Sequence, residues 1–231
     1  MKLTILLFTV PAVLFAASFT DNFESYTPGD DLDSSAYWFT ADSSGSFIIA
    51  DEGGNNIAET VWNGYDFTGY VCMGSAVWSN GTIGCDVKFT GSQAMFALMA
   101  RINGFSSECY IAGIYPAVPP LGTTVIAYVD ATGEYTILSQ DYFYPMNENT
   151  WYDLDFEVTG TDTVSLKLFV NGSVNSTCQD TEHSLQTGIS GVITGYEGST
   201  EPVFSMDNFE VVDTGQPLTA VTFGGIKALF R

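Results

Sequence analysis

The sequence predicts an all-β protein built as a sandwich of two antiparallel sheets, and two observations support this fold class. Apolar and polar residues alternate with a period of two in many segments between about residue 19 and residue 212, as in strands with one buried and one solvated face. Clusters of Gly, Asn, Asp or Pro interrupt the alternation roughly every ten residues, a spacing typical of sandwiches and barrels. Before the C-terminal end, no segment of useful length has apolar residues at the spacing of an amphipathic helix.

The alternation is clearest between residues 151 and 158. There the apolar positions 152, 154, 156 and 158 share one face, and Asp153, Asp155 and Glu157 share the other. By the same criterion we expect strands at Ser18–Tyr26, Phe47–Ala50, Asn56–Val61, Gly81–Thr90, Ala94–Ile102, Cys109–Tyr115, Thr123–Val129, Tyr135–Ser139, Trp151–Val158, Ser165–Val170, Gly188–Ile193 and Val203–Val212.

Turn residues agree with this division into strands. The dipeptides at 80–81 and 171–172 are both Asn-Gly, which supplies the positive φ angles that tight hairpins need. We expect similar turns at Asp130–Gly133 and Thr159–Asp162.

The chain is strongly acidic, and this excludes some partners. It has 231 residues, enough for one sizeable core, and a formal net charge of −21. Between residues 19 and 213 the only Lys and Arg residues are Lys88, Arg101 and Lys167, too few to neutralise a phosphate backbone. Nucleic acid and anionic membranes are therefore not expected partners, and the acidity indicates either solubility or divalent-cation binding.

Residues 1–18 are predicted to be a signal peptide. They contain one Lys, an apolar run and then the small residues Ala16, Ala17 and Ser18. No later stretch is long enough to be a transmembrane helix. We therefore expect a secreted or cell-surface protein whose domain spans residues 19–213.

Four cysteines remain in the exported part of the chain. An oxidising compartment favours two disulfides among three possible pairings, and we expect Cys72–Cys85 and Cys109–Cys178. The single histidine, His183, and the absence of a Cys-x-x-Cys motif argue against a zinc site and against triad-type hydrolysis.

Several short motifs carry a resemblance to a known superfamily. The tetrapeptide Asp-Asn-Phe-Glu occurs at 21–24 and again at 207–210, as expected of two terminal strands in neighbouring places of one sheet. In order, the motifs are Phe19–Tyr26, Met99–Asn103, Tyr110–Tyr115, Thr150–Leu154, Val170–Gly172, Gly191–Val192 and Phe204–Val211. Together they resemble the laminin-G-like branch of the concanavalin A-like lectin/glucanase superfamily.

The resemblance covers residues 19–213 and implies a two-sheet antiparallel jelly-roll sandwich with its first and last strands side by side. It says little about activity, because this architecture occurs in lectins, adhesion modules and glycosidases. Residues 214–231 lie outside it. They combine a Gly- and Pro-containing linker with an apolar end that carries Lys227 and Arg231, and they resemble C-terminal tails of some exported bacterial proteins. We expect a sorting or docking segment there, or a tail that packs on the domain.

The resemblance also implies a structural calcium site. Its expected ligands are Asp207 in the last strand, Asp21 in the first strand and the loop around Gly54. Asp207 shares strand parity with Phe209 and should point inward, where an unpaired carboxylate is costly. Either a Ca²⁺ ion or local backbone N–H groups must then satisfy it.

The row Asp153, Asp155 and Glu157 is the candidate catalytic group. Alternate strand residues lie ~6.5–7 Å apart on one face, within reach of the ~6.5–9.5 Å that separates the two carboxyls of an inverting glycosidase. The row resembles the Glu-x-Asp-x-Glu strand of family 16 glycoside hydrolases but has Asp at its first position. The alternative is a solvated sheet face.

A sugar-binding surface would combine polar and aromatic groups on the concave sheet. The resemblance indicates Arg101, Tyr110 and Asp155 for this surface, and parity places Arg101 opposite Phe96 and Leu98, facing away from the core. An ion pair on the sheet face is the alternative for Arg101. From these features we expect a secreted, non-catalytic module that binds a carbohydrate or surface polymer. A glycoside hydrolase acting through Asp153, Asp155 and Glu157, and a purely structural cell-surface protein, are the alternatives.

Overall fold

A computed structural model describes residues 18–40, 45–62, 67–72, 78–103, 108–118, 120–196 and 201–214 of the chain. For residues 67–72 and 118 it describes the backbone alone. The predicted signal peptide and C-terminal tail lie outside these ranges, apart from Ser18 and Thr214. Among the described residues no helix is long and apolar enough to cross a membrane, and the one helical segment is the short 3₁₀ turn η1 (Leu32–Ser34).

The described chain forms two antiparallel sheets, as predicted. The first has the order β13-β12-β11-β6-β15-β4-β3, with β1 also paired to β15. Its strands are β1 (Ser18–Asp21), β3 (Gly45–Asp51), β4 (Asn56–Trp62), β6 (Gly81–Thr90), β11 (Tyr152–Thr159), β12 (Val164–Val170), β13 (Ser173–Asp180) and β15 (Val203–Asp213). We call this eight-stranded sheet the flat sheet.

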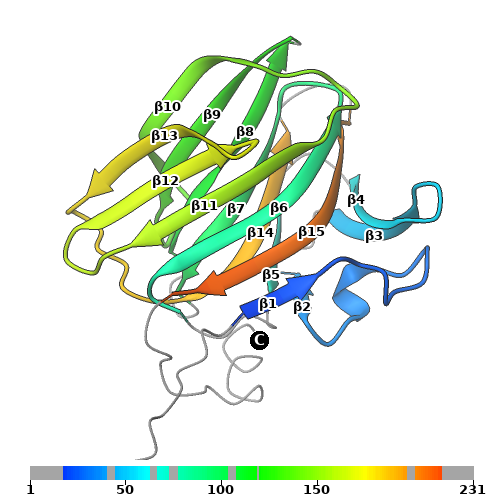
Figure 1. The fold of residues 1–231 in the computed structure, drawn as a ribbon, viewed down its shortest axis with the longest axis horizontal. Helices are drawn as coiled ribbons and strands as arrows, with labels where there is room; N and C mark the ends of the chain where they lie inside the picture. The colour runs from blue at the N-terminus through cyan, green and yellow to red at the C-terminus, as the bar shows by residue number, and fades with distance from the viewer. Residues whose placement is uncertain are drawn as a thin grey trace, which may run out of the picture.

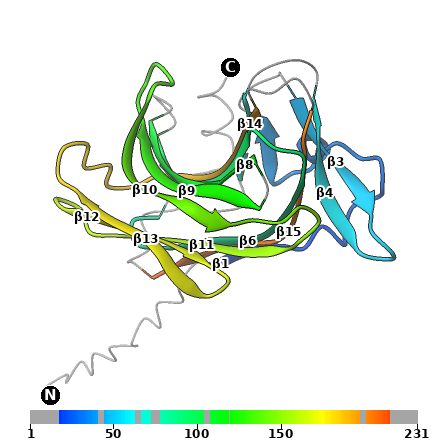
Figure 2. The same cartoon turned by 90° about the horizontal axis from the view of Figure 1, so that it is seen from above.

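The second sheet has seven strands in the order β10-β9-β8-β7-β14-β5-β2. They are β2 (Trp38–Thr40), β5 (Phe67–Cys72), β7 (Ala94–Ile102), β8 (Cys109–Val118), β9 (Leu121–Val129), β10 (Tyr135–Pro145) and β14 (Ile189–Tyr196). Figure 1 shows the two sheets stacked, and Figure 2 shows that β8, β9, β10 and β14 curve into a trough that opens away from the flat sheet. We call this the hollow sheet.

The core fills the space between the sheets. Its buried side chains come from the inward positions of both, among them Phe96, Ile114, Leu154, Phe156 and Phe209. The alternation predicted for residues 151–158 is confirmed, because Tyr152, Leu154, Phe156 and Val158 are all buried. A smaller apolar cluster, formed by Ala97, Met99, Ile102, Cys109, Ile111, Val125, Ala127 and Ile189, lies on the other face of the hollow sheet.

The first and last strands lie side by side, as the repeated Asp-Asn-Phe-Glu motif predicted. Strand β1 pairs with β15 so that Asp21 lies opposite Phe209. The Asp21 carboxylate then fixes the chain after β1, accepting hydrogen bonds from Phe23 N (3.0 Å), Tyr26 Oη (2.7 Å) and Trp38 Nε1 (2.9 Å). Trp38 in turn packs edge-on against Phe209, with ring centroids 4.8 Å apart.

One of the two expected Asn-Gly hairpins is correct. Asn171 and Gly172 both have positive φ, 52° and 70°, and join β12 to β13. The prediction for 80–81 is wrong, because Gly81 begins β6 in extended backbone. There a glycine is required by close approach, since a Cβ at this position would lie 2.3 Å from the carbonyl oxygen of Val212.

Neither predicted disulfide forms. Cys85, Cys109 and Cys178 are free thiols, and the side chain of Cys72 lies outside the described residues. Cys85 packs in the core between the sheets, whereas Cys109 belongs to the cluster on the opposite face of the hollow sheet. Cys178 packs against the core side, so the hollow sheet's two faces separate Cys109 from Cys178.

The Asp21 network yields a stability prediction. Replacing Asp21 with Ala removes the acceptor of three hydrogen bonds in a buried site, and we expect a loss of about 3 kcal/mol in the free energy of unfolding. Urea denaturation measures it, with Asn22→Ala, an exposed neighbour, as the control that changes stability by less than about 0.5 kcal/mol. Equal stability of the two variants would show that Asp21 does not anchor the first strand.

Candidate functional site

A groove on the trough side of the hollow sheet is the candidate site. Its cavity has a volume of about 250 Å³. It crosses strands β7, β8, β9, β10 and β14, which supply Met95, Ile111, Tyr115, Thr123, Val125, Ala127, Tyr135, Ile137, Gln140, Tyr142, Gly195 and Tyr196.

Strand pleating explains why these residues face the groove. In β7 and β8 the even positions Phe96, Ala112 and Ile114 point into the core, so the odd positions Met95, Ile111 and Tyr115 must point the other way. The floor of the groove is therefore apolar and continuous with the smaller cluster on this face.

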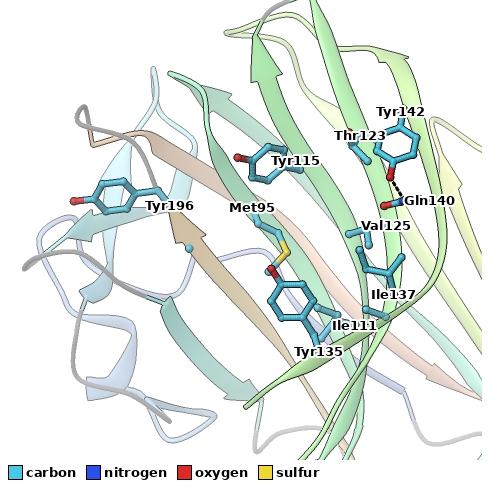
Figure 3. A pocket seen from close by; sticks show the side chains of 12 residues that line it. Met95, Ile111, Tyr115, Thr123, Val125, Tyr135, Ile137, Gln140, Tyr142 and Tyr196 are labelled. Carbon is cyan, nitrogen blue, oxygen red and sulfur yellow. Dashed lines mark hydrogen bonds between the residues drawn. The ribbon is translucent and has the colours of Figure 1, made fainter. Parts of the chain in front are cut away.

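Four tyrosines surround this floor. In Figure 3, Tyr115 and Tyr135 stand on either side of Met95, Ile111 lies beside Tyr135, and Tyr142 and Tyr196 lie toward the two ends. Tyr135 and Tyr142 are 54 % and 58 % exposed, so their ring faces are open to a ligand. Gln140 donates a hydrogen bond from Nε2 to the hydroxyl of Tyr142 and so positions that ring.

No charged side chain lines the part of the groove that the structure describes. The polar groups there are the tyrosine hydroxyls, Thr123 and Gln140. Such a lining can stack on a flat ligand and hydrogen-bond its hydroxyl groups. It offers no carboxylate pair for acid and base catalysis of glycoside hydrolysis.

Arg101 does not reach this surface, and the expectation that it faces outward is wrong. Met99 and Ile102 lie on the same face because the alternation breaks at Arg101, whose φ is +53°. The fully buried guanidinium donates to the carbonyl oxygens of Ser79, Gly160 (2.7 Å) and Leu185 (2.5 Å). Burial lowers its pKa to about 10, so it stays charged at neutral pH and ties three loops together.

Tyr110 is also inside the protein. It is fully buried in the core, and its hydroxyl donates a hydrogen bond of 2.8 Å to Oδ2 of Asp180. Burial tends to raise the pKa of Asp180, but hydrogen bonds from Glu182 N, Tyr110 and His183 outweigh it and leave that pKa lowered. Tyr110 therefore serves the core rather than a ligand.

The acidic row lies on the opposite side of the molecule from the groove. Asp153, Asp155 and Glu157 project from β11 on the outer face of the flat sheet, where Asp153 lies across from Asp86. Glu157 is paired with Lys167 at 2.6 Å. A hollow of about 190 Å³ beside Asp155 is lined by Gly84, Cys85, Asp86, Asp153, Asp155, Asn208 and Glu210.

This hollow perturbs its carboxylates. Burial, followed by the negative charges of Asp153, Glu210 and Asp86, raises the pKa of Asp155 to about 6. Burial and Asp86 also raise the pKa of Asp153.

The structure does not bring the three expected sugar-binding residues together. Arg101 lies at a buried junction of loops, Tyr110 lies in the core, and Asp155 lies on the outer face of the flat sheet.

The carboxylates expected to bind calcium accept hydrogen bonds from the protein's own donors in this structure. Asn55 of the glycine-containing loop does reach Asp207, donating from Nδ2 to Oδ2 at 3.0 Å, and Asn208 N donates to Oδ1 at 2.7 Å. The Gly54 backbone N–H donates to Asp51. Asp21 also has three donors, so both carboxylates take part in hydrogen-bond networks within the protein, which is the alternative to a Ca²⁺ ion that the sequence left open.

Comparison with known structures decides the fold. A β-glucanase from Bacillus licheniformis matches with a TM-score of 0.57 and 11 % identity over 86 % of this chain and 98 % of that one. LamA from Z. galactanivorans, solved with laminaritriose and laminaritetraose, matches with a TM-score of 0.54 and 9 % identity over 86 % and 98 %. The exoplasmic domain of VIP36, in a Ca²⁺/Man₃GlcNAc-bound form, matches with a TM-score of 0.52 and 12 % identity over 80 % and 86 %.

The protein has the concanavalin A-like lectin/glucanase fold. No protein family model and no curated protein matches the sequence. Among the structures it resembles, this fold is shared by a β-glucanase and by the Man₃GlcNAc-bound domain of VIP36, so the fold alone does not separate binding from catalysis.

The sequence-based search missed the groove tyrosines. Tyr135 lies within an expected strand, but that strand was expected to end at Ser139, before Tyr142. The signal that could have found them is the density of aromatic residues between 135 and 144, where Tyr occurs at 135, 142 and 144 and Phe at 143. Only the strand pairing shows that Tyr115 and Tyr196 belong with them.

The acidic hollow yields a pH-dependent prediction. A carboxyl whose pKa is about 6 in the folded protein but near 3.8 when unfolded destabilises the fold once it is ionised, so Asp155→Asn should raise stability at pH 7. We expect a gain of about 1 kcal/mol after allowance for solvent screening. The gain should shrink as the pH falls from 6 toward 4, because wild-type Asp155 then becomes neutral as well.

Thermal denaturation at pH 7 and pH 4.5 tests this. Asp162→Asn, in an exposed turn, removes one charge elsewhere and should have little effect at either pH. A gain for Asp155→Asn that is as large at pH 4.5 as at pH 7 would contradict the electrostatic origin.

Proposed function

We propose that the protein is a secreted, non-catalytic module that binds a carbohydrate or surface polymer in the groove of the hollow sheet. The proposal rests on the four tyrosines that surround an apolar floor. None of the described residues that line the groove is a carboxylate. Export is part of the proposal because residues 1–18 have the composition of a signal peptide.

The chemistry of the groove suits sugar rings. One face of a pyranose consists largely of C–H groups, which pack on an aromatic ring, while its hydroxyls need hydrogen-bond partners at the edge. Tyr135 and Tyr142 supply exposed rings, and Gln140, Thr123 and the tyrosine hydroxyls supply the polar edge. Proteins of the same fold that were solved with oligosaccharides, such as LamA and VIP36, support this ligand class.

A glycoside hydrolase is the second candidate. It is favoured by one observation, the raised pKa of Asp155, because a carboxyl that titrates near neutral pH suits a general acid. Against it, Glu157 is engaged by Lys167, and the row lies on the sheet that faces away from the tyrosine groove. A structural surface protein without a glycan ligand is the third reading.

Affinity electrophoresis in gels that contain laminarin, hydroxyethylcellulose, galactomannan or levan tests binding. We expect at least one of these polymers to retard the protein, and Tyr135→Ala and Tyr142→Ala each to weaken that binding about 10-fold, which corresponds to about 1.4 kcal/mol. Tyr135→Phe keeps the ring and should lose less. Val174→Ala, an exposed apolar position on β13, is the control outside the groove.

The competing functions give other results in the same experiments. Release of reducing sugar that disappears in Asp155→Asn and Glu157→Gln would establish the hydrolase. Retardation that survives both tyrosine substitutions would remove the groove from the binding site. Neither binding nor hydrolysis on the whole panel would leave the structural role.

A further inference from the structure

A second hollow continues the groove toward the turn between β8 and β9, beside the end of β10. It has a volume of about 570 Å³ and is lined by Ala117, Pro120, Leu121, Gly122, Thr123, Tyr142 and Phe143. Thr123 and Tyr142 line both hollows. The two cavities are therefore neighbours along one surface, with Tyr142 at their junction.

Phe143 is the most exposed large apolar side chain of the described residues. It is 76 % exposed, and Leu121 beside the same hollow is 48 % exposed. A break in the β9–β10 register between Asp141 and Tyr144 interrupts the alternation, so the consecutive side chains of Tyr142 and Phe143 both border the hollow. Packing within the fold gives no reason for Phe143 and Leu121 to be exposed. Exposed apolar patches commonly mark binding surfaces.

The combined surface is long. From Tyr196 on β14 to Tyr142 on β10 the groove crosses four strand spacings, a width of ~19 Å. Phe143, the next residue on β10, extends this surface into the second hollow. This length suits several consecutive sugar residues rather than one monosaccharide, and the surface continues past Tyr142 instead of ending at a wall.

Charge restricts the ligand further. The domain has only three cations, and all are engaged elsewhere. Lys88 is paired with Glu52 and lies 4.8 Å above the ring of Trp151, Lys167 is paired with Glu157, and Arg101 is buried. An acidic polysaccharide would find no cation among the described residues that line either hollow, and it would meet a chain of net charge −21.

We propose that the groove and the second hollow, which Phe143 lines, form one continuous track that holds an internal stretch of an uncharged polysaccharide chain. Tyr135 and Tyr142 bind the central sugar residues, and Phe143 is an outer platform that only a longer chain reaches. The inference rests on the proposed glycan-binding function and adds to it the charge and the chain-internal mode of the ligand.

Chain length provides the first test. For whichever neutral polymer of the panel binds, isothermal titration calorimetry compares the disaccharide, the hexasaccharide and the polymer. We expect Phe143→Ala to weaken hexasaccharide and polymer binding about 5-fold and to leave disaccharide binding unchanged, whereas Tyr135→Ala weakens all three. Because Phe143 is so exposed, its substitution should not disturb folding, which the melting temperature checks against Val174→Ala.

Charge provides the second test. Oxidation of the free primary alcohols to carboxylates converts the bound polymer into an anionic one with the same backbone. We expect the oxidised polymer to bind at least 10-fold more weakly at 20 mM NaCl and to recover partly at 500 mM, because salt screens the repulsion. Binding of the neutral parent should not depend on salt.

The outcomes separate this inference from the proposed function. If no glycan binds at all, the proposed function fails. If a neutral glycan binds but Phe143→Ala has no effect on any chain length, or affects the disaccharide equally, the track is refuted while the groove stands. Binding of the oxidised polymer, alginate or heparin as tightly as the neutral polymer would overturn the uncharged ligand, and capture of a second copy of this chain by Phe143 would assign the outer hollow to self-association.

Discussion

The pleat of the hollow sheet is the constraint on which the rest of the structure depends. Each of its strands must bury one set of side chains against the flat sheet, and the other set is then forced onto the trough face. Phe96 and Ile114 fill the core, so Met95 and Tyr115 must line the groove. A one-residue slip in any of these pairings would exchange core and groove residues, which is why the two surfaces are coupled.

The same constraint separates two kinds of chemistry. On β11 the apolar residues face the core, and this places Asp153, Asp155 and Glu157 on the outer face of the flat sheet. The acidic cluster and the tyrosine groove thus lie on opposite faces of one sandwich. Burial, followed by repulsion within the cluster, raises the pKa of Asp155, and this charge lies away from the surface that offers aromatic rings.

The alternation of inward and outward side chains fails where the backbone of a strand is irregular. Arg101 adopts a positive φ, and its side chain joins three backbone carbonyls instead of facing the groove. The register break in β10 brings Tyr142 and Phe143 to the same hollow. Both features change which way a side chain points without changing the local composition, so alternation by itself gives the wrong face at these positions.

The sequence by itself determined the fold class, most strand positions and the adjacency of the first and last strands, because burial of one strand face leaves a period of two that can be read locally. The bounds of β6 and β7 follow directly from it. Strand β13 was not predicted, since an edge strand of mostly polar residues has little to bury, and strands β2 and β5 were missed as well.

Tertiary structure alone decided the rest. It placed Arg101 and Tyr110 inside, left Cys85, Cys109 and Cys178 unpaired, and gathered tyrosines from β8, β10 and β14 around one groove. The physical reason is that strand pairing and register breaks are non-local: they depend on partners far apart in the chain, which a local pattern of residues does not encode.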